Sequence, residues 1–364
     1  MGQFWPTMVK RPSARVDPPI GGLVQKMLSL ILALAAAVTL TSSGAAQMQA
    51  AAPPIEAPGQ LVDVGGWRLH LNCMGGTTMP APTVVFEAGA GAFSVDWSLV
   101  QPEIAKSARA CSYDRAGVGW SDLGPRPRTM AQQVWELHAL LEKGGARPPY
   151  VLVGHSLGGL LVRLYAMTYP SDVRGLVLVD AGDEDGGVVF RNGQMVRVLD
   201  TATGRAVPAP KTSDPLHDSD ITGAIRSQIQ ASADQMSEHA LDPPYDKLPP
   251  AAQRMRQWSF SQVKHWAVND NPYAGDELAA MLAARTQKEP LLGAMPLIVI
   301  SRGISADAKD QIGEQQHARN QASYVRLSSA GRQIIGTSGV HEVMITEPDL
   351  VIAAVRNVLT AVRK

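Results

Sequence analysis

Along most of the chain after residue 60, short apolar runs alternate with stretches whose apolar residues recur at helical spacing. The runs TVVFEAG (83–89) and YVLVG (150–154) are brief and apolar and end in glycine, as expected for strands buried on both faces. LVDVGGWRLHLNC (61–73) alternates around a Gly-Gly pair, which predicts a hairpin. Further predicted strands span 108–114, 173–180, 296–301 and 332–337, and the main predicted helices include 157–170 and 348–362. Repeated alternation of this kind predicts a mostly parallel sheet covered by helices.

Residues 184–292 interrupt this rhythm and contain many prolines. The segment VVFRNGQMVRVLD (188–200) places Asn192-Gly193 between alternating apolar positions, a pattern that predicts a second hairpin. Three helical stretches are expected after it, near 221–238, 250–268 and 275–287. We predict that this insertion forms a cap over the carboxyl edge of the sheet, so that the core is divided between residues 61–183 and 293–364.

Four bulky side chains of the predicted cap have spacings that could place them on one helix face: Met255, Trp258, Val263 and Trp266. Two interpretations of this stripe stay open. The side chains line an apolar acyl pocket, or they form the core of the cap itself, which is the commoner role of an apolar helix face.

The first 46 residues have the order of a secretory signal. A basic lead precedes the apolar run LSLILALAAAVTL (28–40), and small residues suited to cleavage after Ala46 follow it. We therefore expect residues 1–46 to be removed and the protein to be exported, to the periplasm or outside the cell. An uncleaved segment that anchors the protein to a membrane is the alternative. Residues 47–60 are rich in Ala and Pro and predict a linker.

Composition and charge mainly argue against certain partners and cofactors. The chain has 33 Lys and Arg residues and 33 Asp and Glu residues, so no basic excess indicates a nucleic-acid partner. Hydrophobic residues make up 45% of the chain, enough for a full core. Neither a cluster with metal-ligand spacing nor a phosphate-binding glycine loop is apparent, so the sequence predicts no metal and no other cofactor.

The strongest chemical signal is Gly154-His155-Ser156-Leu157-Gly158, which fits the pattern G-x-S-x-G between a predicted strand and a predicted helix. A serine on such a tight turn adopts a strained backbone conformation, so its close neighbours must lack side chains. The turn lifts the hydroxyl of Ser156 above the sheet edge. It also places the N–H of Leu157 at a helix N-terminus, where it can stabilise an oxyanion.

With this motif in its strand–turn–helix context, the chain resembles the α/β-hydrolase family. The resemblance covers residues 60–183 and 293–362 and implies an eight-stranded, mostly parallel sheet with an inserted cap. The turn Asp114–Ser121 (DRAGVGWS) matches the family's D-R-x-G-x-G-x-S pattern and is expected to support the site. After the third strand, where the family has His-Gly-x, this chain has Ala-Gly-Ala, so the resemblance assigns the second oxyanion N–H to Ala90.

The resemblance also implies a histidine between the last strand and the last helix, where Gly339-Val340-His341 stands. A histidine can take a proton from Ser156 and return it to the leaving group near neutral pH. For the acid that orients His341, we expect Asp180, because it ends a central strand that fixes its position. The alternative is Asp307, in the loop after the seventh strand, where the family more often has its acid.

Two cysteines, Cys73 and Cys111, would meet an oxidising compartment if the protein is exported. In the fold that the resemblance implies, they lie on neighbouring antiparallel strands, so a disulfide between them is possible. Such a bridge would stabilise the protein by ~2–4 kcal/mol. Two buried thiols are the alternative.

These observations predict a serine hydrolase that cleaves a carboxylic ester, or a related acyl bond, through an acyl-enzyme. The expected partner is a small acyl substrate, with membrane contact only through the N-terminal segment if that segment is uncleaved. Thioesterase, lactonase and amidase activities on the same residues stay open. A non-catalytic homologue that only binds a ligand is the alternative from another functional class. Dehalogenases and epoxide hydrolases of this fold use an aspartate as nucleophile, and Ser156 argues against both.

Overall fold

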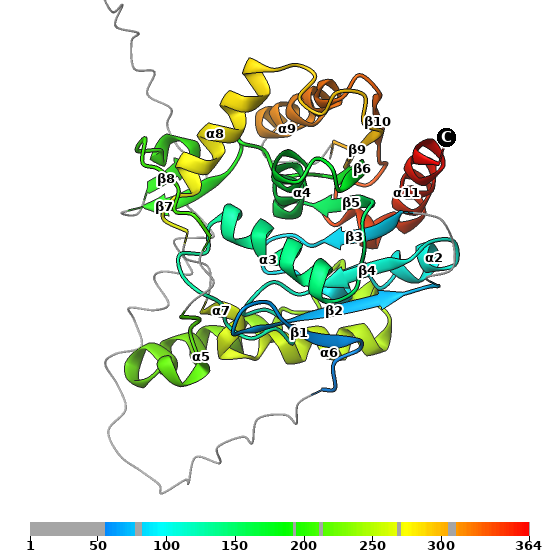
Figure 1. Ribbon diagram of the computed structural model, residues 1–364. Helices are drawn as coiled ribbons and strands as arrows, with labels where there is room; N and C mark the ends of the chain where they lie inside the picture. Colours follow the sequence, from blue (N-terminus) through cyan, green and yellow to red (C-terminus); the bar gives the residue numbers. More distant parts are fainter. Residues whose placement is uncertain are drawn as a thin grey trace, which may run out of the picture. The chain divides into compact units, whose positions relative to one another are not determined.

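The computed structural model describes residues 55–76, 82–191, 194–210, 214–267, 271–304 and 311–363. Eight strands form one sheet in the order β1-β2-β4-β3-β5-β6-β9-β10 (Figure 1). They are β1 (Gln60–Asp63), β2 (Arg68–Met74), β3 (Thr83–Glu87), β4 (Ala110–Tyr113), β5 (Tyr150–His155), β6 (Val173–Val179), β9 (Leu297–Ser301) and β10 (Gly331–Ile335). Within this sheet, β2 pairs antiparallel with β1 and β4, and the remaining pairs are parallel. The predicted fold class, an eight-stranded and mostly parallel sheet, is therefore confirmed.

Helices cover both faces of the sheet, which explains why its central strands are apolar at consecutive positions. In β5, Leu152 points into a cluster with α3 (Met130–Lys143) and α4 (Leu157–Thr168). Its neighbours Val151 and Val153 point to the opposite face, into a cluster with α2 (Gln101–Ala105) and α11 (Pro348–Val362). Because successive side chains of a strand alternate between faces, such a doubly covered strand reads as a continuous apolar run.

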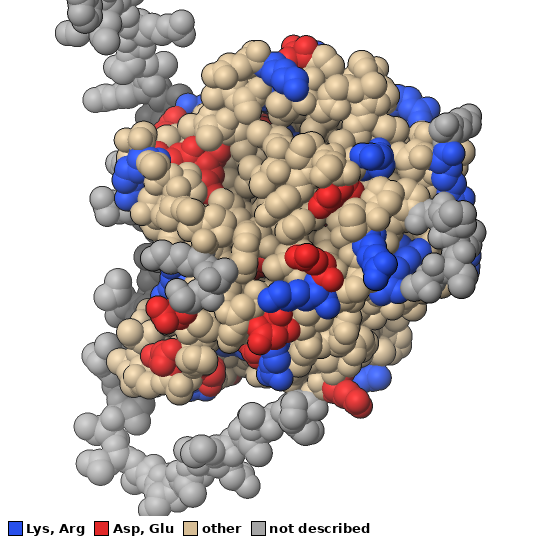
Figure 2. Space-filling view, viewed as in Figure 1, with Lys and Arg blue, Asp and Glu red and all other residues tan. Residues whose placement is uncertain are grey.

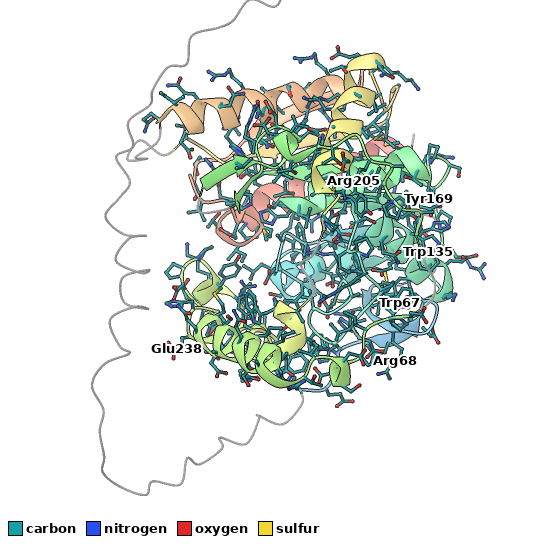
Figure 3. All side chains as sticks on the ribbon, turned by 90° about the vertical axis from the view of Figure 1, so that its left-hand side faces the viewer. Trp67, Arg68, Trp135, Tyr169, Arg205 and Glu238 are labelled. Carbon is teal, nitrogen blue, oxygen red and sulfur yellow. A yellow bond between two sulfur atoms is a disulfide. The ribbon has the colours of Figure 1, made fainter. Side chains whose placement is uncertain are left out.

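The cap lies at two sides of one edge of the sheet. Its first part is the antiparallel pair of β7 (Val188–Arg191) and β8 (Gln194–Arg197), which confirms the predicted hairpin, although the turn residues themselves lie outside the described ranges. Figure 1 shows this pair beside α8 (Ala274–Gln287), and α5 (Gly223–Glu238) with α6 (Pro250–Phe260) on the other side. Figure 3 faces this edge, with Arg205 labelled near α8 and Glu238 labelled at the end of α5.

One predicted cap helix, 250–268, is wrong because the structure divides it into α6 and α7 (Val263–Trp266). Gln262 has an extended backbone, and the side chains of Ser261 and Gln262 both donate hydrogen bonds to the carbonyl of Trp258. Side chains that satisfy the last carbonyls of a helix in this way end it. The stripe from Met255 to Trp266 therefore does not occupy one helix face.

The same four residues belong to clusters that pack the cap on the core, so they do not form a core of the cap alone. Met255, Trp258 and Trp266 are half-buried against the cluster that includes α2 and α11. Val263 is buried in a small separate cluster with Leu123.

The first 54 residues lie outside the described ranges, and with them the predicted signal and most of the predicted linker. The described end of that linker belongs to the folded core, because the carbonyl of Ile55 accepts a hydrogen bond from Trp120 Nε1 at 2.7 Å and the carbonyl of Pro58 lies against the His70 ring. The prediction of a linker as far as residue 60 was therefore too long. None of the helices in the described parts of the chain has the length and apolarity needed to cross a membrane.

A disulfide joins Cys73 of β2 to Cys111 of β4. The two cysteines are direct partners in the antiparallel register of these strands. The bridge closes a loop across 38 positions of sequence and ties the antiparallel edge of the sheet to its parallel centre.

Candidate active site

Ser156 occupies a strained turn between β5 and α4. Its φ angle is +52°, a left-handed conformation that costs free energy for a residue with a side chain. The turn is tight because a Cβ on Gly154 would lie only 2.4 Å from the Gly158 carbonyl oxygen, and one on Gly158 would lie 2.4 Å from the carbonyl oxygen of Glu87. The two glycines of the motif are thus required by space. The turn presents Ser156 at the N-terminus of α4.

His341 follows β10, and its Nδ1 lies 2.6 Å from Asp180 Oδ2. Asp180 follows β6 directly and is fully buried, whereas the His341 side chain is 42% exposed. The other carboxylate oxygen, Oδ1, accepts hydrogen bonds from the backbone N–H of Arg302 at 3.0 Å and from His317 Nε2 at 2.7 Å. A carboxylate held by this many donors keeps the imidazole of His341 in one orientation, with Nε2 directed away from it.

The environment of Asp180 keeps its carboxylate ionised. Burial alone would raise the pKa of Asp180, but hydrogen bonds from His317 and His341 outweigh it and hold this pKa well below its usual range. An ionised acid next to His341 stabilises the imidazolium that forms when His341 accepts a proton.

His155, the second residue of the motif, supports the loop that carries His341. Its Nε2 donates a hydrogen bond to the backbone carbonyl of His341 at 3.0 Å, and the two rings are 4.5 Å apart. Burial and the nearby His341 together lower the pKa of His155 to about 3, so His155 is neutral and acts as a donor. Within the described residues, Ser156 makes no hydrogen bond to His341. Such bonds often tighten only when substrate binds.

The loop after β3 lies against Ser156. A Cβ built on Gly89 would be 3.2 Å from the Cβ of Ser156. Arg115, from the turn after β4, donates hydrogen bonds to the carbonyls of Ala88 and Gly89 and pairs with Glu87 at 2.6 Å. This explains why the D-R-x-G-x-G-x-S turn supports the site: its arginine fixes the loop that contains Ala90.

A cavity of about 550 Å³ opens at this edge of the sheet. Ala90, Leu157, Asp180, His317 and His341 all line it. Apolar side chains from core and cap complete the wall, namely Val118, Met130, Leu160, Val198 and Leu278. The cap residues Met255, Trp258, Val263 and Trp266 do not line it, so the interpretation of that stripe as an acyl pocket is wrong.

The structure thus brings Asp180, His341, Leu157 and Ala90 together beside the turn that carries Ser156. Asp307 lies outside the described residues. His317 was missed, because α9 (Gln311–Ser323) is a largely polar helix and no motif connects it with Asp180. Its role depends on how α9 packs beside β9, which no local pattern encodes.

The described part of the chain contains no group of three or more His, Cys, Asp or Glu side chains placed to hold a metal ion. On the face seen in Figure 2, acidic and basic side chains are interspersed.

Comparison with known proteins points to one family. Residues 82–301 match the sequence model of a family described as the alpha/beta hydrolase fold. The protein YqjL of Bacillus subtilis, which is uncharacterized, is 41% identical over 98 residues, or 27% of this chain and 39% of that protein. The matched stretches thus span well under two thirds of the length of the first curated relatives.

Solved structures resemble the chain over most of its length. The enol-lactonase of Burkholderia xenovorans LB400 has a TM-score of 0.53 and 17% identity, covering 83% of this chain and 100% of its own. The epoxide hydrolase CorEH has a TM-score of 0.52 and 14% identity, covering 83% and 98%. At such identities the likeness shows the fold, and these two enzymes differ in the bond they cleave.

Proposed function

Because this chain belongs to the alpha/beta hydrolase fold family, we propose that it is a serine hydrolase that cleaves a carboxylic ester through an acyl-enzyme. The observation that carries the proposal is the hydrogen bond of 2.6 Å between Asp180 and the half-exposed His341, at a cavity beside the strained turn of Ser156. An aspartate nucleophile, which the epoxide hydrolases and dehalogenases of this fold use, would require an acid where Ser156 stands.

In the proposed reaction, Ser156 Oγ attacks the ester carbonyl carbon while His341 Nε2 accepts its proton. The N–H groups of Leu157 and Ala90 stabilise the oxyanion of the tetrahedral intermediate. His341 then protonates the leaving alcohol, and an acyl-enzyme on Ser156 remains. Water attacks this ester with His341 again as the base, which releases the acid and restores Ser156. Asp180 stays ionised throughout and stabilises the imidazolium of His341.

Labelling by a fluorophosphonate probe tests the nucleophile. The wild-type protein should be labelled on Ser156 and should hydrolyse p-nitrophenyl esters, with a chain-length preference that reports the capacity of the cavity. Ser156→Ala should fold normally and lose turnover by ~10³-fold or more, because the residues of a triad act as a unit. Near-wild-type hydrolysis by this variant would refute the proposal. Thioester, lactone and amide substrates assayed in parallel distinguish the related activities.

We also propose export from the cytosol. The basic, apolar and small-residue order of the first 46 residues supports it, and so does the disulfide between Cys73 and Cys111, because such bridges persist in oxidising compartments. The mass of the intact protein from its native host should correspond to a chain that begins near Gln47. A full-length species that stays in the cytosol would contradict the proposal.

A further inference from the structure

The buried side chain of His265 in α7 connects the cap to the loop after β3 that contains Ala90. This residue is 1% exposed. Its Nε2 lies 3.0 Å from the carbonyl oxygen of Gly91, and its Nδ1 lies 2.9 Å from the hydroxyl of Ser259 in α6. The ring is enclosed by aromatic neighbours, with the Phe260 ring 4.8 Å away and the Phe93 ring 6.3 Å away, edge-on. Its orientation is therefore set by packing as well as by hydrogen bonds.

The direction of this hydrogen-bond chain follows from its two ends. At one end, the backbone N–H of Gly119 donates to Ser259 Oγ at 3.1 Å, which leaves the serine hydroxyl proton for His265 Nδ1. At the other end, the carbonyl of Gly91 can only accept, so His265 Nε2 carries the proton. Burial lowers the pKa of His265 to about 4, in agreement with a neutral ring in this single tautomer.

The carbonyl that His265 binds belongs to the loop that holds Ala90. On the near side of Ala90, Arg115 binds the carbonyls of Ala88 and Gly89. Since N–H and C=O point in opposite directions across a trans peptide, fixing the Gly89 carbonyl also fixes the direction of the Ala90 N–H. On the far side, the Gly91 carbonyl is held from the cap. The loop is thus held on both sides of Ala90, by an arginine of the core and a histidine of the cap.

We propose that His265 is a positioning residue through which the cap sets the geometry of the oxyanion hole. This inference rests on the proposed function, because it assigns the oxyanion N–H to Ala90. Without the donor, the Gly91 carbonyl loses a buried partner and the loop can shift relative to Ser156. Removing an oxyanion-hole donor outright costs ~10²–10³-fold in kcat. Misplacing one should cost ~10–100-fold, with a smaller effect on ground-state binding.

Two variants of His265 separate the hydrogen bond from the packing. His265→Gln keeps an N–H donor near the position of Nε2, and His265→Phe keeps the ring volume without a donor. We expect His265→Phe to lose ~10–100-fold in kcat on a p-nitrophenyl ester, with KM changed less than about threefold. The affinity for an aryl boronic acid, whose tetrahedral adduct on Ser156 occupies the oxyanion hole, should fall in parallel. His265→Gln should stay within about fivefold of wild type on both measures.

Trp266→Phe is the matched control. It removes the hydrogen bond from Trp266 Nε1 to the Phe260 carbonyl, which stays within the cap, and it keeps an aromatic ring beside His265, whose ring lies 4.8 Å from that of Trp266. It should change neither kcat nor boronic acid affinity. The inference is overturned if His265→Phe keeps the wild-type kcat and boronic acid affinity, or if it loses kcat while its boronic acid affinity is unchanged. It is also overturned if Trp266→Phe loses as much kcat and affinity as His265→Phe. Should His265→Phe fail to fold, Ser259→Ala replaces it, since it frees His265 Nδ1 and must weaken boronic acid binding more than ester binding. A wild-type protein without fluorophosphonate labelling or ester hydrolysis would instead refute the proposed function itself.

Discussion

Two buried aspartates of this protein each hold a histidine by its Nδ1, and only one of the pairs lies at the candidate active site. Asp114 binds His70 at 2.9 Å, and both side chains are fully buried. Asp180 binds His341 at 2.6 Å, but here the histidine is 42% exposed and lines the cavity. An aspartate–histidine pair is therefore not sufficient evidence of catalysis.

What separates the pairs is what the rest of each group contacts. The Nε2 of His70 lies against the carbonyl of Pro58, and Asp114 also accepts hydrogen bonds from the backbone N–H groups of Ser94 and Trp120. This pair has a structural role, because it joins the stretch around Pro58, β2 and the turn after β4. His341 instead has its second nitrogen on the cavity side, next to the turn of Ser156. An open side of the imidazole, beside the strained turn of Ser156, is therefore what makes Asp180 and His341 the candidate functional pair.

Replacing each aspartate by asparagine is the most direct test of whether the two pairs have different roles. Asp180→Asn should lose ~10⁴-fold in kcat, the size of the loss for the equivalent change in a serine protease, because an asparagine favours the wrong tautomer of His341. Asp114→Asn should keep its kcat per folded molecule, measured on p-nitrophenyl esters. It should instead lower the melting temperature, since removing one partner of a buried pair costs about 3 kcal/mol.

The opposite pattern would transfer the catalytic role to another acid. If Asp180→Asn keeps its activity, Asp307 is the next candidate, and Asp307→Asn is the variant that then must lose activity. If Asp114→Asn abolishes turnover in a protein that melts like wild type, the structural role of that pair is wrong.

His70 should also make the stability of the protein depend on pH. Burial alone would lower the pKa of His70, but the Asp114 carboxylate outweighs it and the net pKa is raised. A raised pKa in the folded state means that protonated His70 stabilises the protein at pH below its unfolded value of about 6.5, and that this contribution is lost as the pH rises through the folded value.

Urea unfolding of wild type and His70→Asn between pH 5.5 and 8.5 measures this contribution as a difference. Direct comparison is needed because the buried, neutral His155 and His265, with pKa values of about 3 and about 4, have the opposite effect on wild-type stability. The stability lost in His70→Asn should be largest at the acidic end and shrink as pH rises. A loss that grows with pH would contradict the assignment.

The sequence was sufficient for the parts of the molecule whose signals are local. The Gly154–Gly158 motif predicts the turn of Ser156, since a Cβ on either glycine would lie 2.4 Å from a carbonyl oxygen. A strand-end position led to Asp180, whose carboxylate the structure places 2.6 Å from His341; its role as the acid stays a prediction. Residues whose roles depend on tertiary packing gave no such signal. His317 and His265 stand on a polar helix and on a short cap helix, and each reaches the site only because distant elements pack together.

The smallest expected effect concerns the second histidine on Asp180, which has no counterpart on Asp114. His317 donates from Nε2 to Asp180 Oδ1 at 2.7 Å and so withdraws negative charge from the carboxylate that faces His341. Among the described residues, the other charged groups next to this carboxylate are Arg302, whose Nε is 3.4 Å from Oδ2, and Glu314, which pairs with Arg302. Removing the His317 donor leaves more negative charge to hold a proton on His341.

In the pH profile of kcat/KM, His317→Leu should therefore move the acidic limb to higher pH, because the free enzyme needs a neutral His341 to activate Ser156. The kcat on the plateau should change by less than about fivefold, since Asp180 keeps its bonds to His341 and to the Arg302 backbone. His317→Gln is the control: it retains an N–H donor for Oδ1 and should leave the limb where it is in wild type. A limb that moves equally in both variants would show that the charge of His317 acts, and not its hydrogen bond. A limb that moves in neither would show that Asp180 and Arg302 alone set the proton affinity of the site.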